Sequence, residues 1–152
     1  MHSRTAISNS SCLIGNERIS RLDILERLYA PLLIPPAVAA EWRALLPSWI
    51  TVQAVVNQGL VQSLQNQIGP GESEAIALAL ECQVSRILLD DLQARQIAQR
   101  LNLPIVGAAG ILLRAKQQGV IPLVRPLLDG LRNTGFYLSN TIYNQVLQQA
   151  GE

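Results

Sequence analysis

The stretch Gly71–Asp91, GESEAIALALECQVSRILLDD, decides the fold. Small and aliphatic residues follow the acid Glu72 and predict a helix, and an apolar strand then ends in the pair Asp90 and Asp91. A helix start and a strand end can meet at one rim of a parallel sheet, where open α/β sheets bind ligands. Carboxylates that meet at such a rim repel one another unless a cation lies between them. The stretch therefore predicts an acidic site at the edge of a parallel sheet.

The composition predicts one α/β domain over residues 1–152. Hydrophobic residues make up 49% of the chain but aromatic residues only 4%, so the core must be aliphatic. Such a core is typical of helices that cover a parallel sheet. The net charge of +1 argues against a protein that holds nucleic acid by overall electrostatics, although it leaves room for a local basic patch.

Strands and helices alternate along the sequence. The predicted strands lie at 5–8, 32–34, 50–56, 86–90 and 104–106. The predicted helices lie at 19–29, 36–46, 60–67, 72–82, 93–101, 109–118, 123–132 and 139–149, the last with Ser139 as a candidate N-cap. Residues 8–12 are expected to form a polar loop, and residues 69–71 (Gly-Pro-Gly) a firm break. This alternation predicts an α/β fold with a parallel sheet.

Other features bear on the compartment. No apolar run approaches the ~18 residues of a membrane span, and the N-terminus lacks the apolar core of a signal peptide. Cys12 and Cys82 match no metal-ligand spacing and are expected to be free, buried thiols. A cytoplasmic protein is therefore the expectation.

Four segments, in order along the chain, resemble the PIN domain, a metal-dependent nuclease fold, and in particular its toxin-like branch related to VapC-type ribonucleases. They are SNSSCLI (8–14) with RLDIL (21–25) behind it, IPPAVAAEW (34–42), GESEAIALALE (71–81) and ILLDDLQAR (87–95). The tail at 105–151 is also similar to this branch, so the likeness covers nearly the whole chain. It implies a three-layer α/β/α fold with a central parallel sheet.

The resemblance also implies site residues. Glu41, Glu72 and Asp91 match the family's second, third and fourth acids and are the expected catalytic residues. The expected metal site consists of these three with Asp90 and Asn9. The expected contacts to nucleic acid are Ser10, Ser11 and, from its place one turn after Asp91 rather than from the resemblance, Arg95; surface solubility is the alternative role for this arginine.

The sequence departs from the family pattern at two positions. Asn9 stands where the family has its first acid, and Cys12 replaces a proline. An amide oxygen can ligate a metal but brings no charge. After desolvation, a net loss of ~2–3 kcal/mol would weaken metal binding about 30- to 150-fold. We therefore expect Asn9 to weaken the site.

The implied chemistry is metal-assisted phosphodiester hydrolysis without a covalent enzyme intermediate. Mg²⁺ and Mn²⁺ prefer oxygen ligands, and either can lower the pKa of a bound water. The expected function is thus an endoribonuclease toxin of a type II toxin–antitoxin system. Its expected partners are RNA, a small antitoxin and a second copy in a homodimer, with no membrane. The alternatives are an inactive PIN-like module that binds RNA or protein, and a small-molecule-binding α/β domain of another family.

Each acid also has a simpler interpretation. Glu41 would then be a solvated helix residue. Glu72 would complement its helix dipole, with Glu74 equally suited to that role or to the site. Asp90 and Asp91 would cap the following helix.

Overall fold

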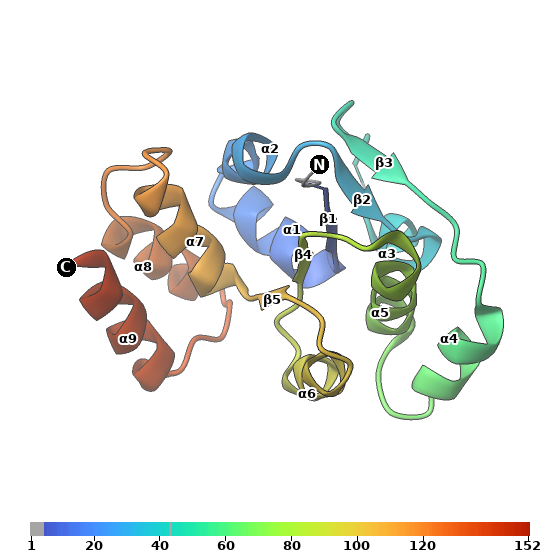
Figure 1. The fold of residues 1–152 in the computed structure, drawn as a ribbon. Coiled ribbons are helices and arrows are strands. Elements are labelled where there is room, and N and C mark those ends of the chain that lie inside the picture. The colour runs from blue at the N-terminus through green and yellow to red at the C-terminus, as the bar shows by residue number, and fades with distance from the viewer. Residues whose placement is uncertain (1–4, 43) are drawn as a thin grey trace.

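A single parallel sheet forms the centre of the molecule in the computed structural model, which describes residues 5–42 and 44–152. Its strands are β1 (Ala6–Ser8), β2 (Leu32–Ile34), β3 (Ile50–Val52), β4 (Arg86–Leu88) and β5 (Ile105–Val106). They lie in the order β3-β2-β1-β4-β5, and every neighbouring pair is parallel (Figure 1). The predicted α/β fold with a central parallel sheet is confirmed.

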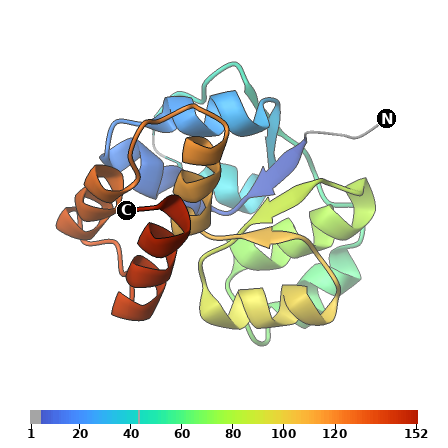
Figure 2. The same ribbon diagram turned by 60° about the vertical axis from the view of Figure 1, so that its left-hand side comes forward.

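Helices connect the strands and extend the C-terminal part of the chain. The first five are α1 (Ser10–Arg18), α2 (Leu22–Tyr29), α3 (Pro36–Glu41), α4 (Gln58–Leu64) and α5 (Pro70–Cys82). The others are α6 (Leu92–Arg100), α7 (Ala108–Gln117), α8 (Arg125–Asn133) and α9 (Asn140–Ala150). The last three gather at one end of the molecule, orange to red in Figures 1 and 2.

Alternating side chains of the strands enter two separate cores, which makes the fold a three-layer α/β/α sandwich. Ala6, Leu32 and Leu88 pack with α1, α2, α7, α8 and α9 on one face. Ile7 and Ile87 pack with α4, α5 and α6 on the other. Both faces of the inner strands are therefore covered, which accounts for their largely apolar sequences, whereas Thr51 and Val52 of the edge strand β3 are exposed.

The chain between β1 and α2 differs from the prediction. Residues 8–12 are not a loop, because Asn9 caps α1, which begins at Ser10. The helix predicted at 19–29 is shorter, because Ser20 has a φ of 58° and α2 begins only at Leu22; a helix that was not predicted, α1, lies before it and ends at Arg18. The polar residues that favour turns also favour N-caps, so the same letters fit either interpretation.

Other boundaries also shift. The helix predicted at 36–46 ends at Glu41, and the Arg43 that it included lies outside the described residues. The predicted break at 69–71 is the start of α5, because Pro70 occupies the first helical turn, where its missing N–H is not needed. Ser139 caps α9, as predicted, and accepts a hydrogen bond from Ile142 N.

Both cysteines are free; Cys12 is buried, as expected, whereas Cys82 is only half-buried. Among the described residues, none of the helices combines the length and the apolar character that crossing a membrane requires.

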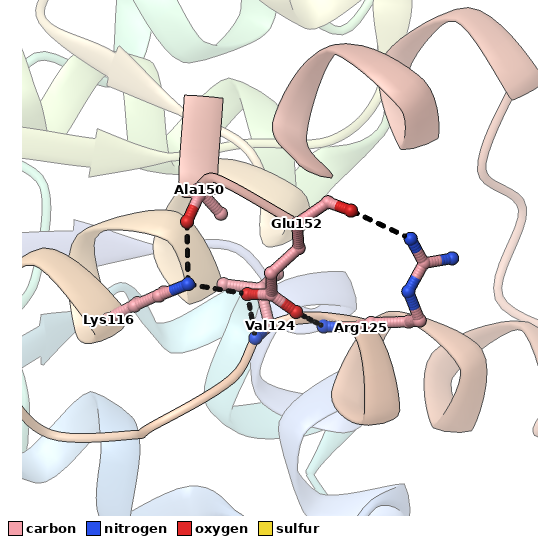
Figure 3. Close-up of polar contacts among 5 residues, drawn as sticks. All are labelled: Lys116, Val124, Arg125, Ala150 and Glu152. Carbon is pink, nitrogen blue, oxygen red and sulfur yellow. Dashed lines mark hydrogen bonds and ion pairs between the residues drawn. The ribbon is translucent and has the colours of Figure 1, made fainter. Parts of the chain in front are cut away.

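Glu152 connects three helices, α7, α8 and α9, through polar contacts (Figure 3). The Glu152 side chain is only 9% exposed and accepts hydrogen bonds from Val124 N (2.7 Å) and Arg125 N (3.0 Å). It also forms an ion pair with Lys116 Nζ (3.0 Å). The Lys116 ammonium also donates to the carbonyl of Ala150. These donors, the backbone N–H of Val124 foremost, lower the pKa of Glu152 from 4.5 to about 2.

The depressed pKa of Glu152 predicts a pH-dependent stability difference between the wild type and Glu152→Gln. The stabilisation is fully present above pH 4.5, the unfolded value, and is lost as the pH falls towards about 2. Urea unfolding between pH 7 and pH 2 should show the wild type more stable at the upper end and the gap closing at the lower end. Glu17→Gln, exposed on α1, is the control and should show no such trend. A gap independent of pH would contradict the role of the carboxylate.

Candidate acidic site at the end of the central strands

The turn between β1 and α1 lies at the topological switch point of the sheet. The chain first adds β2 and β3 on one side of β1 and then adds β4 and β5 on the other side. Asn9 follows β1 directly, and its N–H donates to the carbonyl of Leu88 at the end of β4 (3.1 Å). Its side-chain Oδ1 accepts from Cys12 N (3.2 Å), which caps α1. The carboxyl ends of strands at a switch point are where open α/β sheets bind ligands.

Glu41 reaches this turn from the end of α3. Ser10 Oγ donates a hydrogen bond of 3.0 Å to Glu41 Oε2. The other oxygen, Oε1, lies against the start of α5, only 2.7 Å from where a Cβ on Gly71 would stand. A side chain at position 71 would therefore displace the carboxylate, and the glycine gives it room.

Asp90 reaches the same turn from the other side. Cys12 Sγ donates to Asp90 Oδ2 (3.0 Å), and Ala108 N, at the start of α7, donates to Oδ1 (2.8 Å). Burial raises the pKa of the Asp90 carboxyl, while these two hydrogen bonds and the charge of Arg95 act in the opposite direction. Burial, and then the neighbouring Asp90 charge, raise the pKa of the Cys12 thiol well above its usual value. Two carboxylates thus contact one helical turn, Glu41 through Ser10 and Asp90 through Cys12.

Asp91 and the glutamates of α5 have other partners. Asp91 is exposed and caps α6, because its Oδ2 accepts from Ala94 N (2.8 Å). The carboxylate of Glu72 bends back along its own helix, with Oε2 2.8 Å from a Cβ position on Gly69. Glu74 Oε1 accepts from Ala37 N (3.0 Å) and so links α5 to α3.

The expected nucleic-acid contacts surround the same turn. Ser10 is buried and Ser11 is half-buried in the first turn of α1. Arg95 lies one turn into α6, with Nη1 2.5 Å from a Cβ position on Gly107, whose Cβ position is also 3.1 Å from Asp90 Oδ1. Gly107 therefore lets Arg95 and Asp90 approach the start of α7 together.

The donor set for a metal ion is incomplete. Among residues 5–42 and 44–152, no group of three or more His, Cys, Asp and Glu side chains is placed to hold one. At the centre of the turn, Asn9 Nδ2 is buried and has no hydrogen-bond partner. An amide has only one oxygen, and that of Asn9 is used by the helix cap.

Sequence reasoning missed three contributors to this geometry. Cys12 was expected only as a free, buried thiol in place of a proline, yet it donates to Asp90. Gly71 and Gly107 make room for the Glu41 and Arg95 side chains. The visible signal for these glycines was their place between predicted elements, since Gly71 directly precedes the helix predicted at 72–82 and Gly107 directly follows the strand predicted at 104–106.

Comparison with known proteins agrees with this fold. A family model described as a PIN domain matches residues 5–152. The chain therefore belongs to the PIN domain family, a nuclease-like class. The match rules out a small-molecule-binding domain of another family. The search of curated proteins and the search of solved structures each returned no match.

The burial of Cys12 predicts that the two thiols differ in reactivity. Cys12 is 0% exposed, whereas Cys82 is half-buried. At pH 8, a thiol reagent should modify one thiol per native molecule and two after unfolding. Cys82→Ser should be unreactive until unfolded, and Cys12→Ser should react like the wild type. Rapid modification of Cys82→Ser would contradict the buried position of Cys12.

The capping role of Asp91 predicts an effect on stability that does not depend on catalysis. Asp91→Ala should lower the free energy of unfolding by about 0.5–2 kcal/mol, because Ala94 N loses its acceptor. Asp91→Ser should be nearly neutral, since serine caps as well as aspartate. Denaturant unfolding measures both. Equal stabilities for the alanine and serine variants would show that the cap contributes nothing.

Proposed function

We propose that this PIN domain is a divalent-metal-dependent endoribonuclease of the toxin type, with a metal site that Asn9 weakens. The main support is that Glu41 and Asp90 hydrogen-bond to Ser10 and Cys12 of one helical turn at the switch point. Two carboxylates at the carboxyl ends of parallel strands suit a hard cation and a phosphodiester.

The metal, Mg²⁺ or Mn²⁺ in this proposal, would take its protein oxygens from Glu41 and Asp90. Glu72 and Asp91 are the further acids of the set, and each needs a new side-chain rotamer to join it, because Glu72 bends back on Gly69 and Asp91 caps α6. When bound, the metal would polarise the phosphodiester and lower the pKa of a water nucleophile.

Other residues of the chain orient the two carboxylates and the substrate phosphate. Ser10 fixes one oxygen of Glu41, and Cys12 and the Ala108 N–H fix both oxygens of Asp90. Arg95, beside Asp90, is the cation placed to meet a substrate phosphate. The partners in this proposal are RNA, a small antitoxin that covers the site and a second copy of the chain, all in the cytoplasm.

Asn9 weakens this site for a geometric reason as well as a charge reason. Its single oxygen caps α1, so the atom left over is Nδ2, a donor. An aspartate has two oxygens, so one could cap α1 while the other bound the cation. Asn9 therefore removes both a charge and a ligand atom.

The Nδ2 atom of Asn9 favours a second candidate function, an inactive PIN-like module that binds RNA or a protein partner. A buried donor without a partner is unsuited to a cation but suited to an acceptor such as a phosphate oxygen. In this alternative the site holds an RNA strand without cleaving it.

The substitution Asn9→Asp tests the choice between these functions. It should tighten Mn²⁺ binding about 30- to 150-fold and raise Mn²⁺-dependent cleavage of a labelled single-stranded RNA. Calorimetry measures the first effect and gel electrophoresis the second. The cleavage should disappear when Glu41→Gln or Asp90→Asn is added to Asn9→Asp.

Asn57→Asp provides a matched control. Asn57 also caps a helix, through Leu60 N, so the substitution makes the same chemical change on α4. It should leave metal binding and cleavage unchanged. If wild type and Asn9→Asp both fail to cleave, the nuclease proposal is wrong. Cleavage by Asn9→Asp alone would identify the native chain as an inactive module.

A further inference from the structure

A cleft of about 880 Å³ begins at the acidic site and runs along the open edge of the sheet. It lies between α6, β5, α7 and the segment that leads into α9. Asp90 and Gly107 line one end, so the cleft is continuous with the site described above. Its volume is in the range of pockets that bind ligands, roughly 300–1,000 Å³.

The cleft is apolar inside and carries hydrogen-bonding groups along its sides. Ile105, Leu113 and Val146 line its wall. The side-chain amides that line it belong to Gln96, Gln99 and Gln117, all exposed. An amide can donate and accept at the same time, which suits the edge of a nucleobase.

The charge of the cleft is complementary to an anion. Arg95 and Arg114 line it, and Asp90 is its one acid. Both oxygens of Asp90 already accept hydrogen bonds within the protein. Arg114 lines the cleft as a second cation; among the described residues its buried Nε has no hydrogen-bond partner, and its charge also acts on the Tyr29 hydroxyl.

Tyr137 supplies a flat apolar surface at the same cleft. Its side chain is 85% exposed, whereas the chain's other aromatic residues are buried or half-buried. Unpaired bases stack on aromatic rings of this kind with little regard to sequence. An apolar cleft with two arginines, amides and one free ring therefore fits unpaired nucleotides better than it fits an apolar peptide.

We propose that this cleft binds the unpaired nucleotides of an RNA strand next to the phosphodiester held at the acidic site. Tyr137 stacks on a base, Arg95 and Arg114 meet phosphates, and the three glutamines contact base edges and so set the base preference. The proposal rests on the proposed function for the presence of RNA at the site, and it does not require that the RNA is cleaved.

The test measures binding without cleavage. A short fluorescent single-stranded RNA is titrated with the full chain in excess EDTA, and the anisotropy gives the dissociation constant. Tyr137→Ala should weaken binding about 5- to 150-fold through the loss of stacking, and Tyr137→Phe should bind like the wild type. Arg114→Gln should reduce the slope of log K against log salt by about 0.7, as expected for one lost phosphate contact on a single strand.

Leu123→Ala is the matched control. Leu123 is 50% exposed but lies outside the cleft, so its removal should not change RNA binding. Equal affinities for wild type and Tyr137→Ala would overturn the proposal, as would wild-type protein that does not bind RNA. Loss of a protein partner in Tyr137→Ala with RNA binding intact would also overturn it and identify a protein-docking surface. RNA binding that needs Tyr137, in a chain whose Asn9→Asp variant does not cleave, would support the cleft and refute the nuclease.

Discussion

The site depends on the cap that Asn9 places on α1. The three residues of β1 are buried between β2 and β4, and the chain must leave this strand at the middle of the sheet. Asn9 makes that exit by donating its N–H to Leu88 and accepting from Cys12 N. The turn thus fixed presents Ser10 to α3 and Cys12 to the end of β4. Glu41 and Asp90 both accept hydrogen bonds from this turn.

The cap also shows why asparagine and aspartate differ here by more than a charge. Both residues are good N-caps, so the fold does not discriminate between them. The difference lies in the second terminal atom, which is a donor in asparagine and an acceptor in aspartate. In this chain that atom is buried and unsatisfied. With asparagine the cap is kept, and the second terminal atom at its centre is a buried hydrogen-bond donor.

Much of the fold was predictable because the hydrophobic pattern and the positions of helix-starting residues such as proline indicated the same elements. Pro36 stands in the first turn of a predicted helix, and the strands predicted at 32–34 and 86–90 contain β2 and β4. The start of α1 was not predictable, since Asn9 and the two serines after it fit a loop equally well.

The positions of the acids along the chain also indicated the right rim of the sheet. Their side-chain directions did not follow from the sequence, because these depend on tertiary contacts. Cys12 and Asp90, which are hydrogen-bonded, lie 78 positions apart in the sequence. The Asp91 carboxylate instead caps α6, the helix that directly follows it.

The link between α3 and α5 has a consequence for ligand affinity. Glu74 accepts from the backbone of Ala37, and Glu41 lies against Gly71, so the two helices are joined at two points. Ser10 holds the remaining oxygen of Glu41. This hydrogen bond orients the exposed carboxylate of Glu41 before anything binds, so less side-chain entropy is lost on complex formation than for an unrestrained glutamate.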